Sequence, residues 1–119
     1  MTNPQDMTNK QLNIALEVFL GAKEDRYRAG QVLKGTYSVP SRDYATNSAD
    51  SLSIQEVAVA KNGLGYLAYL SDVIEPDDLG YQQEGELIAY TLDHTVRLLT
   101  ATPRQRAEAA YMTLKEFNN

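Results

Sequence analysis

The same pattern, T-x-x-Q, precedes an apolar helical stripe near each end of the chain. Thr8 with Gln11, and Thr102 with Gln105, can each form a capping box, in which the two side chains satisfy free backbone donors of the first helical turn. Pro103 follows at the first helical position, where its missing N–H has no cost. Two helices therefore begin at defined points close to the two ends of a 119-residue chain, and the segment between them must pack against both.

Three helical stripes follow from the spacing of the apolar residues. The first comprises Leu12, Ala15, Leu16, Phe19 and Leu20, and the last comprises Ala107, Ala110, Tyr111, Leu114 and Phe117. A middle helix is expected to begin at Asn47 or Ser48, both capping residues. Its stripe comprises Ala49, Leu52, Glu56, Val59 and Ala60, flanked by Ile54 and Val57. The β-branched content of residues 53–60 keeps a strand as an alternative. The KNGLG segment, residues 61–65, should end this helix, and residues 66–74 should form two more helical turns.

Strands are expected in two places. QVLK and TYSV, residues 31–34 and 36–39, are short candidates joined by a glycine turn. ELIAYTL and TVRLLT, residues 86–92 and 95–100, are separated only by Asp93 and His94, the length of a tight hairpin turn. The predicted fold class is α+β: a small antiparallel β-sheet flanked by helices from both ends of the chain, an α/β/α sandwich. Residues 1–6 are expected to be a flexible extension, and residues 7–119 a single domain.

Composition excludes several classes of function. The chain has no cysteine, so disulfides and thiolate metal sites are excluded. No apolar run approaches the ~18 residues of a membrane span, and the N-terminus lacks the layout of a signal peptide. The only histidine, His94, is better explained as a turn residue than as a base. Nucleophile-elbow, phosphate-loop and calcium-loop patterns are also absent from the sequence. We expect a soluble protein of the cytoplasm, not an enzyme, with no metal or cofactor.

Three segments resemble the phage ABA sandwich domain family of small phage and prophage proteins. MTNKQLNIAL (residues 7–16) is similar to its opening helix, VPSRDYATNSADSLSIQEV (39–57) to its central segment, and TATPRQRAEAAYMTL (100–114) to its closing helix. The segments keep the family's order and span most of the chain. The resemblance implies a sheet sandwiched by helices and a phage origin, and it implies no catalytic residues.

The start of the last helix is the first candidate binding site. Free N–H groups and the helix dipole favour an anion there, and Arg104 and Arg106 add positive charge. Arg97, together with Arg42 or Tyr44, could converge on the same end of the sheet. The candidate ligand-binding residues are Arg97, Tyr44, Thr102, Arg104 and Arg106. The simpler explanation is a surface ion pair between Arg104 and Glu108, four residues later.

The second candidate is an acidic surface. Residues 62–96 contain no Lys or Arg, although the whole chain has a net charge of only −5. The candidate surface for a basic protein partner comprises Asp72, Glu75, Asp77, Asp78, Glu84 and Glu86. A solvated loop that aids solubility is the alternative. This charge distribution argues against direct binding of nucleic acid.

Together these features predict a non-enzymatic phage accessory protein that acts by binding. Its expected role is counter-defence, by sequestering a small anionic nucleotide signal or by masking a basic host protein. The alternative is a self-associating regulatory or assembly module without a small ligand. A homo-oligomer is expected in either case, because small domains often build their sites between subunits.

Overall fold

The computed structural model describes residues 3–74 and 95–117. A short 3-10 helix, η1 (Pro4–Asp6), precedes α1 (Asn9–Phe19), and three strands follow: β1 (Lys23–Glu24), β2 (Gln31–Lys34) and β3 (Tyr37–Pro40). The long helix α2 (Ser48–Ile74) comes next, then a helical turn over residues 95–99, and finally α4 (Pro103–Lys115). The predicted α+β class, with an antiparallel sheet and helices from both ends of the chain, is confirmed.

Both capping boxes form as predicted. The Thr8 and Thr102 hydroxyls each accept a hydrogen bond, at 3.1 Å, from the backbone N–H of the glutamine three residues later. Each glutamine side chain in turn accepts a bond from the backbone N–H of its threonine. These four bonds fix where α1 and α4 begin, and Pro103 occupies the first turn of α4 as expected.

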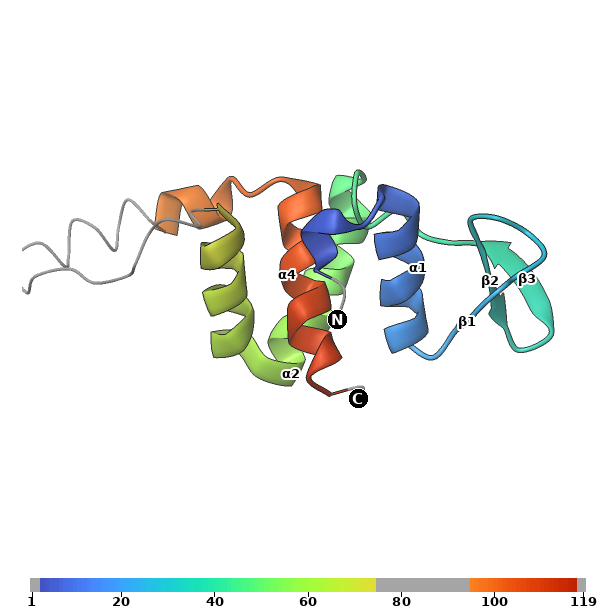
Figure 1. The fold of residues 1–119 in the computed structure, drawn as a ribbon. Coiled ribbons are helices and arrows are strands. Elements are labelled where there is room, and N and C mark those ends of the chain that lie inside the picture. The colour runs from blue at the N-terminus through green and yellow to red at the C-terminus, as the bar shows by residue number, and fades with distance from the viewer. Residues whose placement is uncertain (1–2, 75–94, 118–119) are drawn as a thin grey trace, which may run out of the picture.

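The sheet is a three-stranded antiparallel meander in the order β1-β2-β3. Val32 pairs with Val39, and Lys34 pairs with Tyr37 on either side of the turn. Gly35 has a φ of +67°, in the left-handed region, so the expected glycine turn between the two strands is confirmed. The sheet lies at one end of the described molecule, and α1 separates it from α4 (Figure 1).

The core lies where α1, α2 and α4 meet. Small residues of α4, Ala107, Ala109 and Ala110, are fully buried, so α2 approaches α4 closely. The buried face of α2 carries Ser51, Ile54 and Ala58 in its first half. The Ser51 hydroxyl donates to Ser48 O at 2.9 Å, which satisfies the group within the helix and allows its burial.

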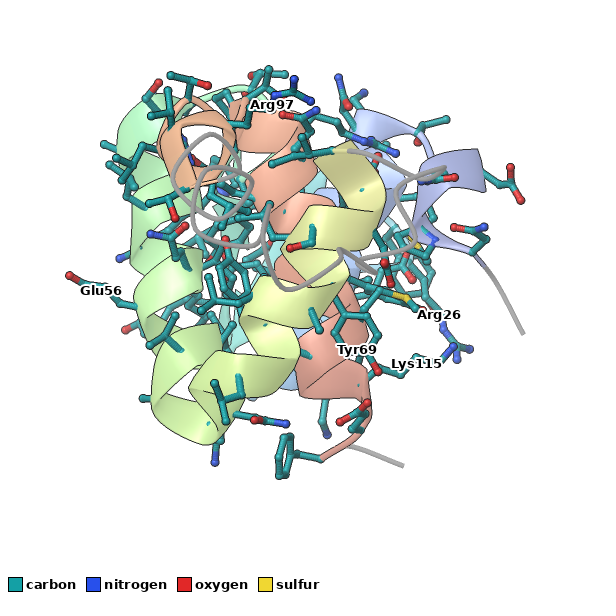
Figure 2. The ribbon with its side chains drawn as sticks, turned by 90° about the vertical axis from the view of Figure 1, so that its left-hand side faces the viewer. Arg26, Glu56, Tyr69, Arg97 and Lys115 are labelled. Carbon is teal, nitrogen blue, oxygen red and sulfur yellow. The ribbon has the colours of Figure 1, made fainter. Side chains whose placement is uncertain are left out.

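Two predicted stripes were wrong in part. On α2 the predicted buried residues are exposed: Leu52 is 47% and Val59 45% accessible, and Glu56 points away from α4 (Figure 2). The face that packs against α4 is instead the one that carries Ser51, Ile54 and Ala58. On α4 the stripe is buried from Ala107 to Leu114, but Phe117 lies beyond the last turn and is half exposed.

The KNGLG segment breaks the helix, as predicted, so α2 consists of two helical halves joined at a kink. Asn62, which has extended backbone angles with a φ of −161°, lies at this kink. Its side-chain oxygen accepts a hydrogen bond from Gly65 N at 3.0 Å and so caps the second half of the helix. A Cβ atom at Gly65 would lie 2.4 Å from Asn62 Nδ2, so this position requires glycine while the cap is in place. The predicted helical turns over residues 66–74 are confirmed.

The strand predicted over residues 95–100 was wrong, because residues 95–99 form a helical turn. Thr100 ends it: its N–H bonds to Val96 O and Arg97 O, and its hydroxyl bonds to Arg97 O at 3.1 Å. These helical hydrogen bonds, which come just before the Thr102 cap, outweigh the β-branched composition of the segment. The other strand candidate, residues 86–92, and the turn at Asp93 and His94 lie outside the described residues.

Candidate functional site

Arg104 is fully engaged within the protein. Its Nε donates to Glu108 Oε2 at 2.5 Å, and its Nη1 donates to Asn9 Oδ1 at 2.7 Å. Its Nη2 donates to the carbonyl oxygens of Pro4 and Met7, both at 2.7 Å. The guanidinium therefore fastens η1 and the start of α1 to α4, and its donors point to protein acceptors, not outward to an anion.

The other candidate residues near the start of α4 lie apart from one another. The Thr102 hydroxyl is committed to the capping box. Arg97 lies on the 95–99 turn, exposed at the end of the molecule shown in Figure 2. Arg106 is half-buried, and its Nη1 is buried without a hydrogen-bond partner among the described residues. Burial raises the pKa of Tyr66, and the nearby charge of Arg106 opposes part of that rise, so Arg106 faces the contact between α2 and α4.

Tyr44 belongs to a different site, built around a carboxylate that the sequence analysis did not single out. Glu17, on α1, is only 2% exposed. Its Oε1 accepts a hydrogen bond from the Tyr44 hydroxyl at 2.9 Å. Its Oε2 accepts a longer hydrogen bond from Arg42 N at 3.4 Å and pairs with Lys34 Nζ at 3.6 Å. Both oxygens of this buried carboxylate therefore have partners, and those of Oε2 are the more distant.

A cavity of about 460 Å³ opens onto this carboxylate. It lies where the C-terminal end of α1, the turn between β2 and β3 and the segment before α2 meet. The charged and hydrogen-bonding residues of its wall are Glu17, Lys34, Arg42 and Tyr44. Leu20 and Ala22 supply apolar surface. Its volume lies within the range typical of small-molecule sites, as does the combination of apolar wall and few polar groups.

The segment that carries Arg42 and Tyr44 is held firmly against α1. Asn13, one turn before Glu17, accepts a bond from Ala45 N at 2.9 Å and donates to Asp43 Oδ1 at 3.1 Å. Asp43 also accepts bonds from the backbone and hydroxyl of Thr46. These bonds, the Thr46 hydroxyl first, hold the pKa of Asp43 below its ordinary value. The cavity wall is therefore pre-formed, and the half-exposed Lys34 side chain pairs with the buried Glu17 at 3.6 Å.

The electrostatics of the cavity are mixed. Burial, and then the bond to Glu17, raise the pKa of Tyr44 well above its ordinary value, so its hydroxyl stays a donor at neutral pH. Lys34 and Arg42 add two positive charges at the rim against the single negative charge of Glu17. The arrangement suits a ligand that presents both an anionic group and an N–H or ammonium donor.

Helical periodicity offered one signal that would have found Glu17. Asn13 and Glu17 are four residues apart and lie on the buried face of α1 beside Leu12 and Leu16. A polar pair on an apolar face must be satisfied by neighbours. The identity of those neighbours, Tyr44 and Lys34, depends on how residues 31–44 return to α1, and spacing along the chain does not encode that.

Of the predicted acidic surface, only Asp72 lies within the described residues. It is exposed on the second half of α2. Glu75, Asp77, Asp78, Glu84 and Glu86 lie outside the described residues, so this surface stays a prediction. Within residues 3–74 and 95–117, no helix is long and apolar enough to cross a membrane. The same residues contain no group of three or more His, Cys, Asp or Glu side chains placed so that they could hold a metal ion.

Comparisons of the chain with protein-family models, with curated proteins and with solved structures gave no match. The resemblance to the phage ABA sandwich family therefore stays a hypothesis based on three sequence segments.

Proposed function

We propose that the protein acts without catalysis, by binding a small anionic ligand of the nucleotide class in the cavity beside Glu17. The observation that carries this proposal is the Glu17 carboxylate, which is buried to 2% exposure, lines the cavity, and has only longer contacts at Oε2, to Arg42 N at 3.4 Å and Lys34 Nζ at 3.6 Å. A ligand donor at that oxygen would add a short, charge-assisted hydrogen bond.

The two ends of such a ligand have separate partners. An N–H or amino group of a nucleobase would donate to Glu17 Oε2. Its phosphate would lie between the side chains of Arg42 and Lys34, which are close enough to the carboxylate to line the same cavity. The biological role that fits this chemistry, together with the phage resemblance, is counter-defence by sequestration of a nucleotide signal.

Ligand binding should appear as a rise in melting temperature. A panel of mononucleotides and cyclic nucleotides would be added to the purified protein, and any stabilising compound confirmed by calorimetry. A ligand at one hundred times its Kd stabilises the fold by about 2.7 kcal/mol. Glu17→Gln keeps the shape of the side chain but adds an amide donor at the cavity, and Arg42→Ala removes the phosphate partner. Both variants should abolish the shift.

Lys34→Ala and Lys61→Ala form a matched pair. Both remove one exposed lysine, but only Lys34 lines the cavity, whereas Lys61 lies on α2. The first should weaken binding and the second should not. If no compound of the panel shifted the melting temperature, or if Lys61→Ala weakened binding as much as Lys34→Ala, the proposal would be wrong.

One observation favours the second candidate function, a self-associating module. The exposed stripe of α2 places Leu52 and Val59 on a single helix face. A second copy of the chain is the natural occupant, because a two-fold interface brings the same apolar face from each partner.

Leu52→Lys with Val59→Lys should convert an oligomer to a monomer in light scattering. The control, Leu99→Lys on the 95–99 turn, should leave the mass unchanged. A wild-type protein that is monomeric at high concentration would rule this out.

A further inference from the structure

The fold gathers positive charge on the segment that carries the sheet. Residues 21–42, here called the arm, contain five basic residues and two acidic ones. Their local charge is +3, whereas the other described residues, with eight acidic and six basic side chains, carry −2. The arm is also the part of the described molecule farthest from the second half of α2 (Figure 1). A positive projection of this kind presents a local surface for an anionic partner.

The outer face of the arm combines these charges with an exposed aromatic ring. Val32 is buried, and Val39, its partner in the ladder, lies on the same face, so this face is the inner one. Leu33 and its partner Lys23 lie on the opposite, outer face. A cleft of about 400 Å³ there is lined by Asp25, Tyr27, Arg28, Leu33, Thr36 and Ser38.

Tyr27 is 97% exposed, between the exposed Arg26 and Arg28. A tyrosine ring in a folded protein normally packs its face against other side chains and keeps only its hydroxyl in water. The ring of Tyr27 makes almost no such contact, so it contributes little to the fold.

The one carboxylate in the cleft is already satisfied. Asp25 Oδ2 accepts a bond from the Ser38 hydroxyl at 2.6 Å, and Asp25 Oδ1 accepts one from Tyr27 N at 3.0 Å. These bonds fix the turn that presents Tyr27, and Arg28 lies near enough to offset the charge. Asp25 is therefore the group that positions the turn, and its charge is partly screened from a ligand in the cleft.

We infer that the outer face of the arm binds single-stranded nucleic acid, with an unpaired base stacked on Tyr27 and the flanking phosphates held by Lys23, Arg26 and Arg28. An exposed aromatic ring between cations is the arrangement by which proteins hold unpaired bases with little sequence preference. A duplex hides its base faces, and an acidic peptide offers no flat ring for Tyr27, so both fit less well. The net charge of the whole chain predicts no nucleic-acid binding, but the fold gathers positive charge on the arm, apart from the second half of α2.

Fluorescence anisotropy with the full chain tests this inference. The probes are a short labelled oligodeoxythymidylate, an oligouridylate of the same length, and a duplex of that length. We expect both single strands to bind at low salt and the duplex to bind more weakly. Tyr27→Ala should weaken single-strand binding by about five- to a hundred-fold, the loss expected for one stacked base. Arg26→Ala with Arg28→Ala should reduce the slope of log K against log salt by about 1.4, because each lost phosphate contact removes about 0.7.

Lys61→Ala with Lys115→Ala is the matched control. It removes the same charge from α2 and α4, and it should leave the affinity and the slope within about two-fold of wild type. Circular dichroism would show that each variant is folded. The inference is overturned by absence of binding at low salt, by equal binding of duplex and single strand, or by a Tyr27→Ala variant that binds as wild type does. Because no variant in this test touches Glu17 or Arg42, its failure leaves the proposed nucleotide cavity unaffected.

Discussion

Replacement of Arg104 by alanine should destabilise the protein by releasing its N-terminal segment from α4. The guanidinium makes four short hydrogen bonds: to Glu108, to Asn9, and to the carbonyl oxygens of Pro4 and Met7. In the variant, Glu108 remains almost buried and loses its partner, and the carbonyl oxygens of Pro4 and Met7 lose the bonds from Arg104. The effect should therefore exceed that of an ordinary surface ion pair, which contributes about 0–1 kcal/mol.

The magnitude follows from the burial of the partners. A hydrogen bond to a charged group contributes about 1.5–3 kcal/mol when considered alone. The four bonds do not add, because the Arg104 side chain is 25% exposed and water replaces part of them. Loss of one member of a buried pair costs about 3–5 kcal/mol, and the partial exposure of Arg104 places the expected loss near the lower limit. A loss of ~3 kcal/mol corresponds to a fall in Tm of about 10–15 °C for a domain of this size.

Chemical denaturation of four proteins measures the effect: wild type, Arg104→Ala, Glu108→Ala and the double variant. The double variant should be more stable than the sum of the single losses predicts, because it leaves no unpaired charge. Arg104→Lys should recover little of the lost stability, since the single nitrogen of an ammonium group cannot replace the three donor nitrogens of the guanidinium. Hydrogen exchange at the Met7 amide, which bonds to Pro4 O, should speed up in Arg104→Ala. A loss below about 1 kcal/mol, or unchanged exchange at Met7, would refute the role of Arg104 as a clamp.

Three further predictions concern the core and the cavity. Ile54→Ala should lower the free energy of unfolding by about 2–5 kcal/mol, because Ile54 is fully buried. Leu52→Ala, only two positions away but 47% exposed, should lower it by less than about 1 kcal/mol in the same denaturation assay. Equal losses would contradict the orientation of α2. The pKa of Asp43 is lowered in the folded state, so its stabilisation is present above its ordinary value of 3.8 and is lost as the pH falls through the folded value. Asp43→Asn should therefore be less stable than wild type by about 1 kcal/mol at neutral pH, with the gap closing in a pH series below 3.8, and a gap that persists in acid would argue against this origin. The pKa of Tyr44 is raised in the folded state, so above pH 10 the unfolded chain loses this proton first and stability falls, by up to about 1.4 kcal/mol per pH unit for this group. Tyr44→Phe should therefore lose stability less steeply in alkali. An identical decline would mean that Tyr44 titrates freely.

The sequence determined the elements whose signals are local. The capping boxes at Thr8 and Thr102 and the turn at Gly35 formed as expected, because each depends on bonds between residues at most three apart. The interruption at KNGLG and the helical turns that follow it were also predicted from the sequence, although only the structure showed that Asn62 is the cap of the second half.

Only the tertiary structure decided which surfaces face inward and which side chains meet. The stripe through Leu52 and Val59 and the buried face through Ile54 and Ala58 are both compatible with a helix, and the small residues of α4 selected the second. The sequence offered Arg104 either an anion or, more simply, Glu108 as its partner, and the return of the N-terminal segment to α4 supplied two carbonyl acceptors that no spacing could predict. The Glu17 cavity depends in the same way on distant partners: Lys34 lies 17 positions after Glu17 in the sequence, and Tyr44 lies 27 positions after it. Local bonds are encoded in neighbouring residues, but the partner of a helix face or of a buried charge is fixed only by the packing of the whole chain.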